Sequence, residues 1–250
     1  MTLRHAHGHA GPSAGAGSPG RGTIVPLRLL LVGYGKMGRL VEELAPSHLC
    51  EVTGRIDVGL SDWSAPADVA VDFSTAEALG ANFPRYVERR LAVVIGTTGW
   101  SALAAELRGE AERAGLGVVA AANFSIGVNL FQMIVAEAAR LLQRHDPYGA
   151  WIHEAHHAAK RDAPSGTALL LRDVMAEAGY RRPIDISSTR AGAIPGVHTV
   201  GFDGPSDTIE LTHTARDRRG FAAGALVAAR WIHGRRGWFT MRDVLEKGEG

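Results

Sequence analysis

The sequence predicts an α/β protein, with a Rossmann-type, doubly wound parallel sheet followed by a second domain of α+β type. Two observations carry this prediction. Residues 28–121 alternate short apolar runs with helix-type segments, as expected of a parallel sheet with helices on both faces. After residue 125 one long helical segment and then successive strand-like pieces, separated by Gly and Pro, favour a mixed or antiparallel sheet.

The composition is that of an ordinary globular protein. Of its 250 residues, 46% are hydrophobic and 21% are charged, which is enough for one large domain or two small ones. The formal net charge of +1 argues against strong recruitment of nucleic acid or an anionic membrane. Cys50 is the single cysteine, so a disulfide framework is excluded and a cytoplasmic location is expected. No apolar run approaches the ~20 residues of a membrane-spanning helix.

Residues 1–27 form a segment of Gly, Ala, Pro, Ser and His. The segment lacks the apolar region of a secretion signal. We expect a tail without fixed structure.

The first strand is predicted at residues 28–32, a short apolar run typical of a buried parallel strand. It leads directly into G-x-G-x-x-G, formed by Gly33, Gly35 and Gly38, and then into helical spacing at residues 40–44. In this strand–turn–helix setting the motif predicts dinucleotide binding. Gly33 would make the tight turn, Gly35 would let a pyrophosphate approach, and Gly38 would let helix and strand pack. An incidental glycine-rich turn is the alternative.

The second strand, residues 51–57, ends in an acid. Asp57 follows the glycine motif at about the 20 residues expected of the side chain that binds the ribose hydroxyls of the cofactor. Lys36 and Arg55 would instead meet a 2′-phosphate.

Three further strands are predicted at residues 67–74, 91–95 and 117–121, with helices at 76–90 and 101–114. The last two strands end in small polar turns, Gly96-Thr97-Thr98-Gly99 and Ala122-Asn123-Phe124-Ser125. In a doubly wound sheet the ligand lies at the carboxyl ends of the strands. These turns are therefore candidates for contact with a flat nicotinamide ring, although ordinary β–α turns would carry no function.

The second half begins with a helix at residues 127–144 and a strand at 150–154. A loop rich in His and charge follows, and Pro164-Ser165-Gly166-Thr167 then starts a helix. Backbone N–H groups at Ser165, Gly166 and Thr167 would bind an anion such as a carboxylate.

The loop itself carries proton-transfer chemistry. His156 or His157 can exchange a proton near neutral pH, and Lys160 adds positive charge. Adjacent residues of a strand point to opposite faces, so the two histidines should differ in role. The set suits a small, multiply carboxylated substrate that must be protonated.

The loop has two other interpretations, a metal site and a solvated loop. His153 and His156 form His-x-x-His, which offers two metal ligands. The single cysteine and the nearby Lys160 argue against a metal, so we predict none. A solvated loop without function is the second alternative.

The remaining strands are predicted at residues 185–190, 197–202 and 207–214. A helix at residues 221–233 and an apolar segment at 238–241 follow, and we expect this last part of the chain to return to the first domain.

The run E-A-H-H-A-A-K-R-D-A-P-S-G-T-A, Glu154 to Ala168, resembles the signature of the 4-hydroxy-tetrahydrodipicolinate reductase (dihydrodipicolinate reductase) family. Residues 33–38, 96–99, 121–125 and 241–245 also match motifs of that family. The resemblance covers about residues 28–245. Residues 1–27 have no counterpart, and the segment between Gly38 and Asp72 is shorter than in longer members.

The resemblance implies reduction of 4-hydroxy-2,3,4,5-tetrahydrodipicolinate by NADH or NADPH, in lysine and diaminopimelate biosynthesis. In the family pattern His156 is the acid–base residue and Lys160 is a proton donor. In the same family pattern His157, Gly166 and Thr167 contact the dicarboxylate substrate, and we expect Ser165 to contact it as well.

The cofactor-binding residues expected from these motifs are Gly33, Tyr34, Gly35, Lys36, Met37, Gly38, Asp57, Gly96, Thr97, Thr98, Ala121, Ala122, Asn123 and Phe124. The expected organisation is a dinucleotide-binding domain at residues 28–123 and a substrate-binding domain at 124–220. The second domain would build a homotetramer, and residues 221–250 would return to the first.

Two alternatives remain at this point. One is another two-domain NAD(P)-dependent dehydrogenase, acting for example on an aspartate-derived aldehyde, although such enzymes lack the His-His…Lys…Ser-Gly-Thr loop. The other is a cofactor-binding sensor without turnover.

Overall fold

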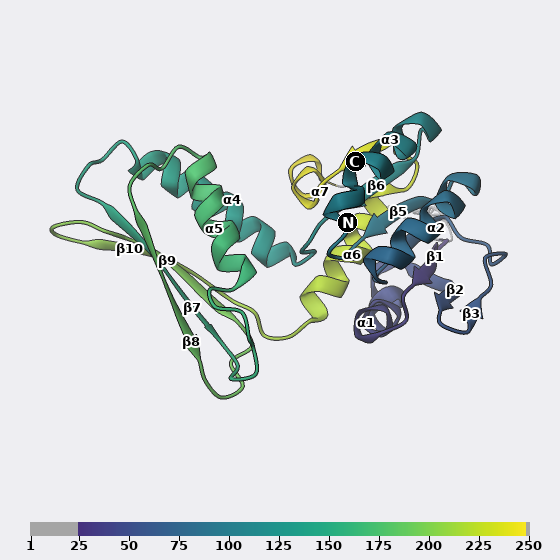
Figure 1. Ribbon diagram of the computed structural model, residues 1–250, viewed down its shortest axis with the longest axis horizontal. Helices are drawn as coiled ribbons and strands as arrows, with labels where there is room; N and C mark the ends of the chain where they lie inside the picture. The colour runs from purple at the N-terminus through teal and green to yellow at the C-terminus, as the bar shows by residue number, and fades with distance from the viewer. Residues whose placement is uncertain (1–24, 249–250) are drawn as a thin grey trace, which may run out of the picture.

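The computed structural model describes residues 25–248, which form two lobes joined by two crossings of the chain (Figure 1). The first crossing lies near residues 121–126 and the second near residues 215–219. Almost all of the segment expected to be a disordered tail lies outside the described residues. No helix among the described residues has both the length and the apolar character needed to cross a membrane.

The first lobe contains a seven-stranded sheet with the order β11-β6-β5-β4-β1-β2-β3. All neighbouring strands run parallel except β3, a short strand that pairs antiparallel with β2 and that the sequence pattern did not predict. The strands are β1 (Leu27–Val32), β2 (Cys50–Asp57), β3 (Leu60–Ser61), β4 (Val69–Asp72), β5 (Ala92–Ile95), β6 (Gly117–Ala120) and β11 (Gly237–Phe239).

Helices cover both faces of this sheet because its strands are apolar on both faces. Leu29 and Leu31 of β1 face one core, which includes residues of α1 and α6, whereas Leu30 and Val32 face a second core with residues of α2 and α3. The doubly wound fold is thereby confirmed. Its helical elements are α1 (Lys36–Leu44), η1 (Ala45–His48), α2 (Ala76–Glu88), η2 (Ser101–Leu103), α3 (Ala104–Ala114), α6 (Arg219–Ile232) and α7 (Met241–Lys247).

The direction of winding reverses between β1 and β4, which are neighbours in the sheet. Ligands of such sheets bind at this switch point, beyond the carboxyl ends of the strands. Gly33 follows β1 with φ +84°, and a Cβ added to it would lie 2.4 Å from the carbonyl oxygen of Phe73. Only glycine fits this turn, because the chain after β4 passes so close to it.

The second lobe holds a mixed four-stranded sheet with the order β10-β9-β7-β8. Strands β7 and β8 are parallel and connected through α5, while β9 is antiparallel to both β7 and β10. This agrees with the predicted α+β domain. The elements are α4 (Ile126–Leu142), β7 (Gly149–His156), α5 (Gly166–Glu177), β8 (Ile184–Arg190), β9 (Val197–Asp203) and β10 (Thr208–Thr214).

Only one face of this second sheet is covered by helices among the described residues (Figure 1). Ile152 and Val200 point to that face, where they are buried with Phe131 of α4 and Leu171 of α5. The opposite face carries polar and half-buried side chains such as Thr199, which hydrogen bonds Thr212 across the strands at 3.0 Å.

The C-terminal part of the chain lies on the first lobe. Strand β11 extends the large sheet by pairing parallel with β6, and α6 packs on the same sheet. The apolar segment predicted at residues 238–241 forms a strand only as far as Phe239, because Thr240 is the N-terminal cap of α7. The Thr240 side chain accepts the N–H of Asp243, and the Asp243 side chain accepts the N–H of Thr240.

Candidate active site

The glycine turn of the first lobe leaves room for a pyrophosphate. Gly35 is the N-terminal cap of α1, and a Cβ placed on it would have no atom within 4 Å. At Gly38 a Cβ would instead lie 2.4 Å from the carbonyl oxygen of Gly33, so this glycine allows helix and turn to pack. The open backbone at Gly35 and the positive end of α1 together fit a dinucleotide phosphate.

The adenosine side differs in one respect from the predicted arrangement. Asp57 ends β2 as an exposed side chain, as the motif requires. Arg55, however, forms an ion pair with Glu42 of α1, and Glu42 also accepts the Tyr34 hydroxyl. Arg39, which directly follows Gly38, was not among the residues predicted for this side. Its guanidinium lies 5.5 Å from the centre of the Tyr34 ring. The exposed Arg39 side chain therefore places positive charge beside the glycine turn, whereas Glu42 offsets the charge of Arg55.

A cavity of about 230 Å³ lies at the switch point. Four predicted cofactor residues line it. The other three, which no sequence motif marked, are Phe73, Arg218 of the second crossing and Phe221 of α6. The lining is Met37, Phe73, Gly96, Ala122, Phe124, Arg218 and Phe221. A Cβ on Gly96 would lie 2.1 Å from the Phe73 ring, so glycine keeps this wall closely packed.

Buried Asp72 fixes the turn that follows β5. Its carboxylate accepts hydrogen bonds from Ser74, from the Thr97 hydroxyl at 2.7 Å and from the Tyr86 hydroxyl at 2.7 Å. Burial, with the charge of Asp72 beside it, raises the pKa of Tyr86 well above its usual value. The Thr97 side chain is thereby occupied, while Thr98 is exposed.

The turn after β6 lies where the chain first crosses between the lobes. The Asn123 side chain accepts the backbone N–H of Ser125 at 2.8 Å, and Asn129 donates to the Asn123 carbonyl at 2.9 Å. A second cavity, of about 360 Å³, is lined by Ala121 and Asn123 of this turn and by Leu170 of α5. The predicted cofactor turn thus borders on the second lobe.

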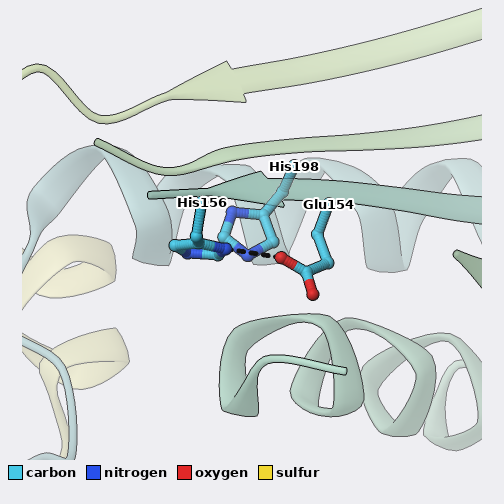
Figure 2. A group of neighbouring side chains, drawn as sticks. All are labelled: Glu154, His156 and His198. Atoms are coloured by element: carbon cyan, nitrogen blue, oxygen red, sulfur yellow. Dashed lines mark hydrogen bonds and ion pairs between the residues drawn. The ribbon is translucent and has the colours of Figure 1, made fainter. Parts of the chain in front are cut away.

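In the second lobe, Glu154 and His156 project from the same face of β7 and meet His198 of β9 (Figure 2). The Nδ1 atom of His156 lies 2.5 Å from Oε2 of Glu154, and the rings of His156 and His198 stand edge to face with centres 5.1 Å apart. His198 was missed in the sequence, because its place depends on the pairing of Glu154 with His198 across two strands. His157 lies one residue beyond β7 and is exposed.

Glu154 is completely buried and fully hydrogen bonded. Arg190 of β8 donates to both carboxylate oxygens, at 2.7 and 2.9 Å, and the backbone N–H of Ser165 donates at 3.2 Å. Burial alone would raise the pKa of Glu154. The hydrogen bonds from the side chains of Arg190, Ser188 and His156, with that from the Ser165 N–H, outweigh burial and lower this pKa to about 2.

His198 is held neutral near pH 7. Burial first, and the nearby His156 second, lower the pKa of His198 to about 4. Its Nε2 atom lies 3.0 Å from the Ser165 hydroxyl, which also accepts the N–H of Ala168 as the N-terminal cap of α5.

One sequence expectation for the helix start is wrong. Ser165 does not offer a free N–H group, because this group donates to Glu154 and the residue is 1% exposed. Gly166 and Thr167, the first residues of α5, are the ones at the accessible surface.

Lys160 lies beside that helix start and forms a 2.8 Å ion pair with Asp162. Lys160, with the N–H of Gly166, holds the pKa of Asp162 below its usual range. Asp162 thus contacts two of the groups that were predicted to hold an anionic substrate, Lys160 and the N–H of Gly166.

The buried cluster has the composition of a metal site, since one ligand atom each of Glu154, His156 and His198 lie within 4.8 Å of one another. The guanidinium of Arg190 already donates to both oxygens of Glu154, so a metal cation would meet its positive charge. The His-x-x-His pair cannot chelate one ion, because His153 faces the other side of the sheet and hydrogen bonds Ser187 at 2.9 Å. The arrangement is better suited to holding a proton.

The chain combines a G-x-G-x-x-G turn on a doubly wound sheet with a buried His–Glu pair in a second lobe of α+β type. Together these features define a two-domain, pyridine-nucleotide-dependent oxidoreductase. The chain belongs to the dihydrodipicolinate reductase family. The N-terminal model of that family matches residues 27–124, and its C-terminal model matches residues 127–245.

Proteins named 4-hydroxy-tetrahydrodipicolinate reductase are similar over much of the chain. That of Christiangramia forsetii is 35% identical over 233 residues, covering 88% of this chain and 98% of the relative. That of Myxococcus xanthus is 42% identical over 201 residues, covering 73% of each chain. Among solved structures, a dipicolinate-bound dihydrodipicolinate reductase from Paenisporosarcina sp. TG-14 has a TM-score of 0.74 at 22% identity, covering 86% of this chain and 97% of that one. This last likeness shows the fold.

Proposed function

We propose that this protein reduces 4-hydroxy-tetrahydrodipicolinate to tetrahydrodipicolinate in the cytoplasm, using NADH or NADPH, in lysine and diaminopimelate biosynthesis. The observation that carries the proposal is the hydrogen-bonded pair His156–Glu154 beside the start of α5. It combines an acid–base group with a carboxylate-binding helix end, in a chain whose relatives bear the name of this reductase.

We assign the cofactor to the lobe of residues 28–123, completed by residues 221–250. The open backbone at Gly35 would hold its pyrophosphate, and Asp57 its ribose. The cavity between Met37 and Phe221 would enclose its nicotinamide. The 4-hydroxyl group of the substrate would leave as water, which gives a conjugated cyclic imine. When bound, the reduced nicotinamide supplies the two electrons that reduce this imine.

The second lobe, residues 124–220, would bind the dicarboxylate and supply the proton. Its N–H groups at Gly166 and Thr167 would donate hydrogen bonds to one carboxylate, and His157 would contact the substrate. Lys160 would release Asp162 and pair with the substrate, so that the positive charge of Lys160 lies beside the reacting ring. His156 would give the proton that the reduced ring must gain, and Nε2 is the atom available for this because Nδ1 contacts Glu154.

We further propose that four copies associate through the uncovered face of the second sheet. This face presents Trp151, His153 and Thr199 without a covering helix among the described residues. A half-buried sheet face that includes Trp151 is suited to packing against the same faces of the other copies.

Oxidation of NADH or NADPH, followed with substrate produced in place by dihydrodipicolinate synthase, tests the activity. We expect turnover with this substrate and none when the synthase is omitted. Binding of cofactor without any turnover would contradict the proposal and indicate a sensor.

A further inference from the structure

Glu154 stands between two parts of the proposed site that lie apart in the sequence. One carboxylate oxygen, Oε2, accepts from His156, and the other, Oε1, accepts the backbone N–H of Ser165 at the start of α5. Arg190 contacts both oxygens from β8 and also donates to the carbonyl of Asp162 in the loop between β7 and α5. A single buried group therefore touches the acid–base histidine and the anion-binding turn.

The charge of Glu154 decides which nitrogen of His156 carries the proton. An ionised carboxylate accepts hydrogen bonds and cannot donate them. Its partner at 2.5 Å, Nδ1 of His156, must therefore carry the hydrogen. The other ring nitrogen, Nε2, is left for exchange with a ligand.

The surroundings of Nε2 agree with this assignment. Among the described residues Nε2 has no hydrogen-bond partner, and Gly196 lies beside it with φ +139°. A Cβ on Gly196 would lie 3.2 Å from Nε2, so glycine keeps the space at this atom open. The neighbouring His198, neutral near pH 7, adds no repelling charge to a protonated His156.

We propose that Glu154 is a positioning residue of the reaction, which fixes the Nδ1–H form of His156 and ties this ring to the carboxylate-binding start of α5. The proposal rests on the proposed function and deepens it. The substrate carboxylate at Gly166 and Thr167 and the proton at Nε2 of His156 would then be held in one fixed relation. Arg190 supports Glu154 by keeping it ionised.

A purely structural role would be different. A buried Glu154–Arg190 ion pair needs no histidine, and it would leave the two neutral forms of His156 free to interconvert. The position of the hydrogen on His156 therefore separates the two roles, whether or not the enzyme turns over.

The direct test is nitrogen NMR of the histidine rings, with the signal of His156 assigned from its absence in His156→Asn. In the wild-type protein we expect neutral His156 in the Nδ1–H form, and finding the Nε2–H form would overturn the proposal even if no variant folds. In Glu154→Gln we expect the population to shift toward the Nε2–H form, because the amide NH₂ can donate to Nδ1. His153, on the same strand but the opposite face, is the internal control and should not change.

Kinetics supply the second readout. Glu154→Gln should lower kcat by about 10²-fold or more, with little change in KM for NADH, because proton transfer and not cofactor binding is impaired. The solvent deuterium isotope effect on kcat should increase, and Glu154→Asp, which keeps the charge, should recover part of the rate. Near-normal kcat in folded Glu154→Gln would overturn the proposal. Absence of turnover in the wild type would reject the proposed function. The position of the hydrogen on His156, observed by NMR, would still test the role of Glu154.

Discussion

Two buried carboxylates organise the residues at the proposed site. Asp72 ends β4 in the first lobe and holds the turn containing Thr97 through a hydroxyl hydrogen bond. Glu154 lies near the end of β7 in the second lobe and holds His156 and the backbone of Ser165. Each carboxylate is 0% exposed and receives several donors, so the cost of its burial is offset by hydrogen bonds. Each thereby fixes a turn that bears the proposed functional residues.

Removal of the proposed proton-transfer groups should affect turnover and spare cofactor binding. His156→Ala and Lys160→Ala should each lower kcat by about 10²-fold or more, the usual size for loss of a general acid or base. NADH affinity, measured by calorimetry, should be retained because both residues lie in the second lobe. Near-normal kcat in either variant would show that its assigned role is wrong.

The stability of the protein should fall in two stages on acidification. The pKa of His198 is about 4 in the folded state and 6.5 for an ordinary histidine, so between these values only the unfolded chain takes up the proton. The free energy of unfolding should therefore decrease as the pH falls from about 6.5 to about 4. Glu154, with its pKa lowered from 4.5 to about 2, should extend the loss below about pH 4.5.

Urea unfolding of wild type and His198→Asn at several pH values checks this prediction. The variant should lose less stability than the wild type between about pH 6.5 and 4. Equal slopes for the two proteins would mean that His198 titrates normally in the folded state.

At the scale of the element, the start of α1 is the part of the first lobe that should decide cofactor binding. Gly35→Val would place a branched side chain where the backbone is now open, so pyrophosphate approach should be blocked. Calorimetry should show that NADH affinity collapses while circular dichroism stays native. Gly149→Val, at an open Cβ position of the second lobe that likewise has no positive φ, is the matched control and should bind NADH normally. Unchanged NADH binding by Gly35→Val would make the motif incidental.

The choice between NADH and NADPH should depend on charge at α1 and β2. Asp57 favours a free ribose and repels a 2′-phosphate, whereas Lys36 and Arg39 offset that repulsion, and Arg55 does so less because Glu42 pairs with it. Wild type should use both cofactors without a difference of orders of magnitude, since one charge-assisted contact is worth about 1.5–3 kcal/mol. The double variant Lys36→Met, Arg39→Met should raise KM for NADPH at least about tenfold and leave KM for NADH nearly unchanged.

Arg108→Met, on the exposed surface of α3, is the matched control and should alter neither constant. A thousandfold preference of the wild type for either cofactor would contradict this account, as would equal loss of both cofactors in the double variant.

At the scale of the whole molecule, the two lobes differ in how completely they are covered. Within residues 25–248 the first sheet has helices on both faces, whereas the second has α4 and α5 on one face only (Figure 1). The cavity around Phe73, proposed to hold the nicotinamide, is lined by residues of the first lobe and by Arg218 of the second crossing, and none of the His-rich loop contributes to it. We expect the two crossings, near residues 121–126 and 215–219, to act as the hinge that brings the lobes together on binding.

Disruption of the uncovered sheet face should break the proposed tetramer. Thr199→Arg places a large charge at the middle of this face, so light scattering should report a smaller assembly than for the wild type. Glu106→Arg, an exposed change on α3 of the first lobe, should leave the assembly intact. A wild-type monomer, or a Thr199→Arg tetramer, would contradict the proposed interface.

The doubly wound fold, the family and the local motifs could all be predicted from the amino-acid sequence. The glycine turn at Gly33, Gly35 and Gly38 and the loop from His156 to Thr167 are encoded in residues close together along the chain, where spacing and residue type restrict the backbone. Backbone sterics and helix-start chemistry act over a few residues, so these features are readable without the fold.

The tertiary structure alone decided which distant residues complete the sites. His198 and Arg190 reach Glu154 because β9 and β8 pair with β7 in one register, and a shift by one residue would turn either side chain to the opposite face. The N–H of Ser165, which the sequence predicts to be free, donates to Glu154 because the start of α5 packs against β7. Arg218 and Phe221 line the cavity proposed for the nicotinamide because α6 returns to the first sheet. Register and helix placement follow from burial of whole strand and helix faces, a property of the complete core and not of any short segment.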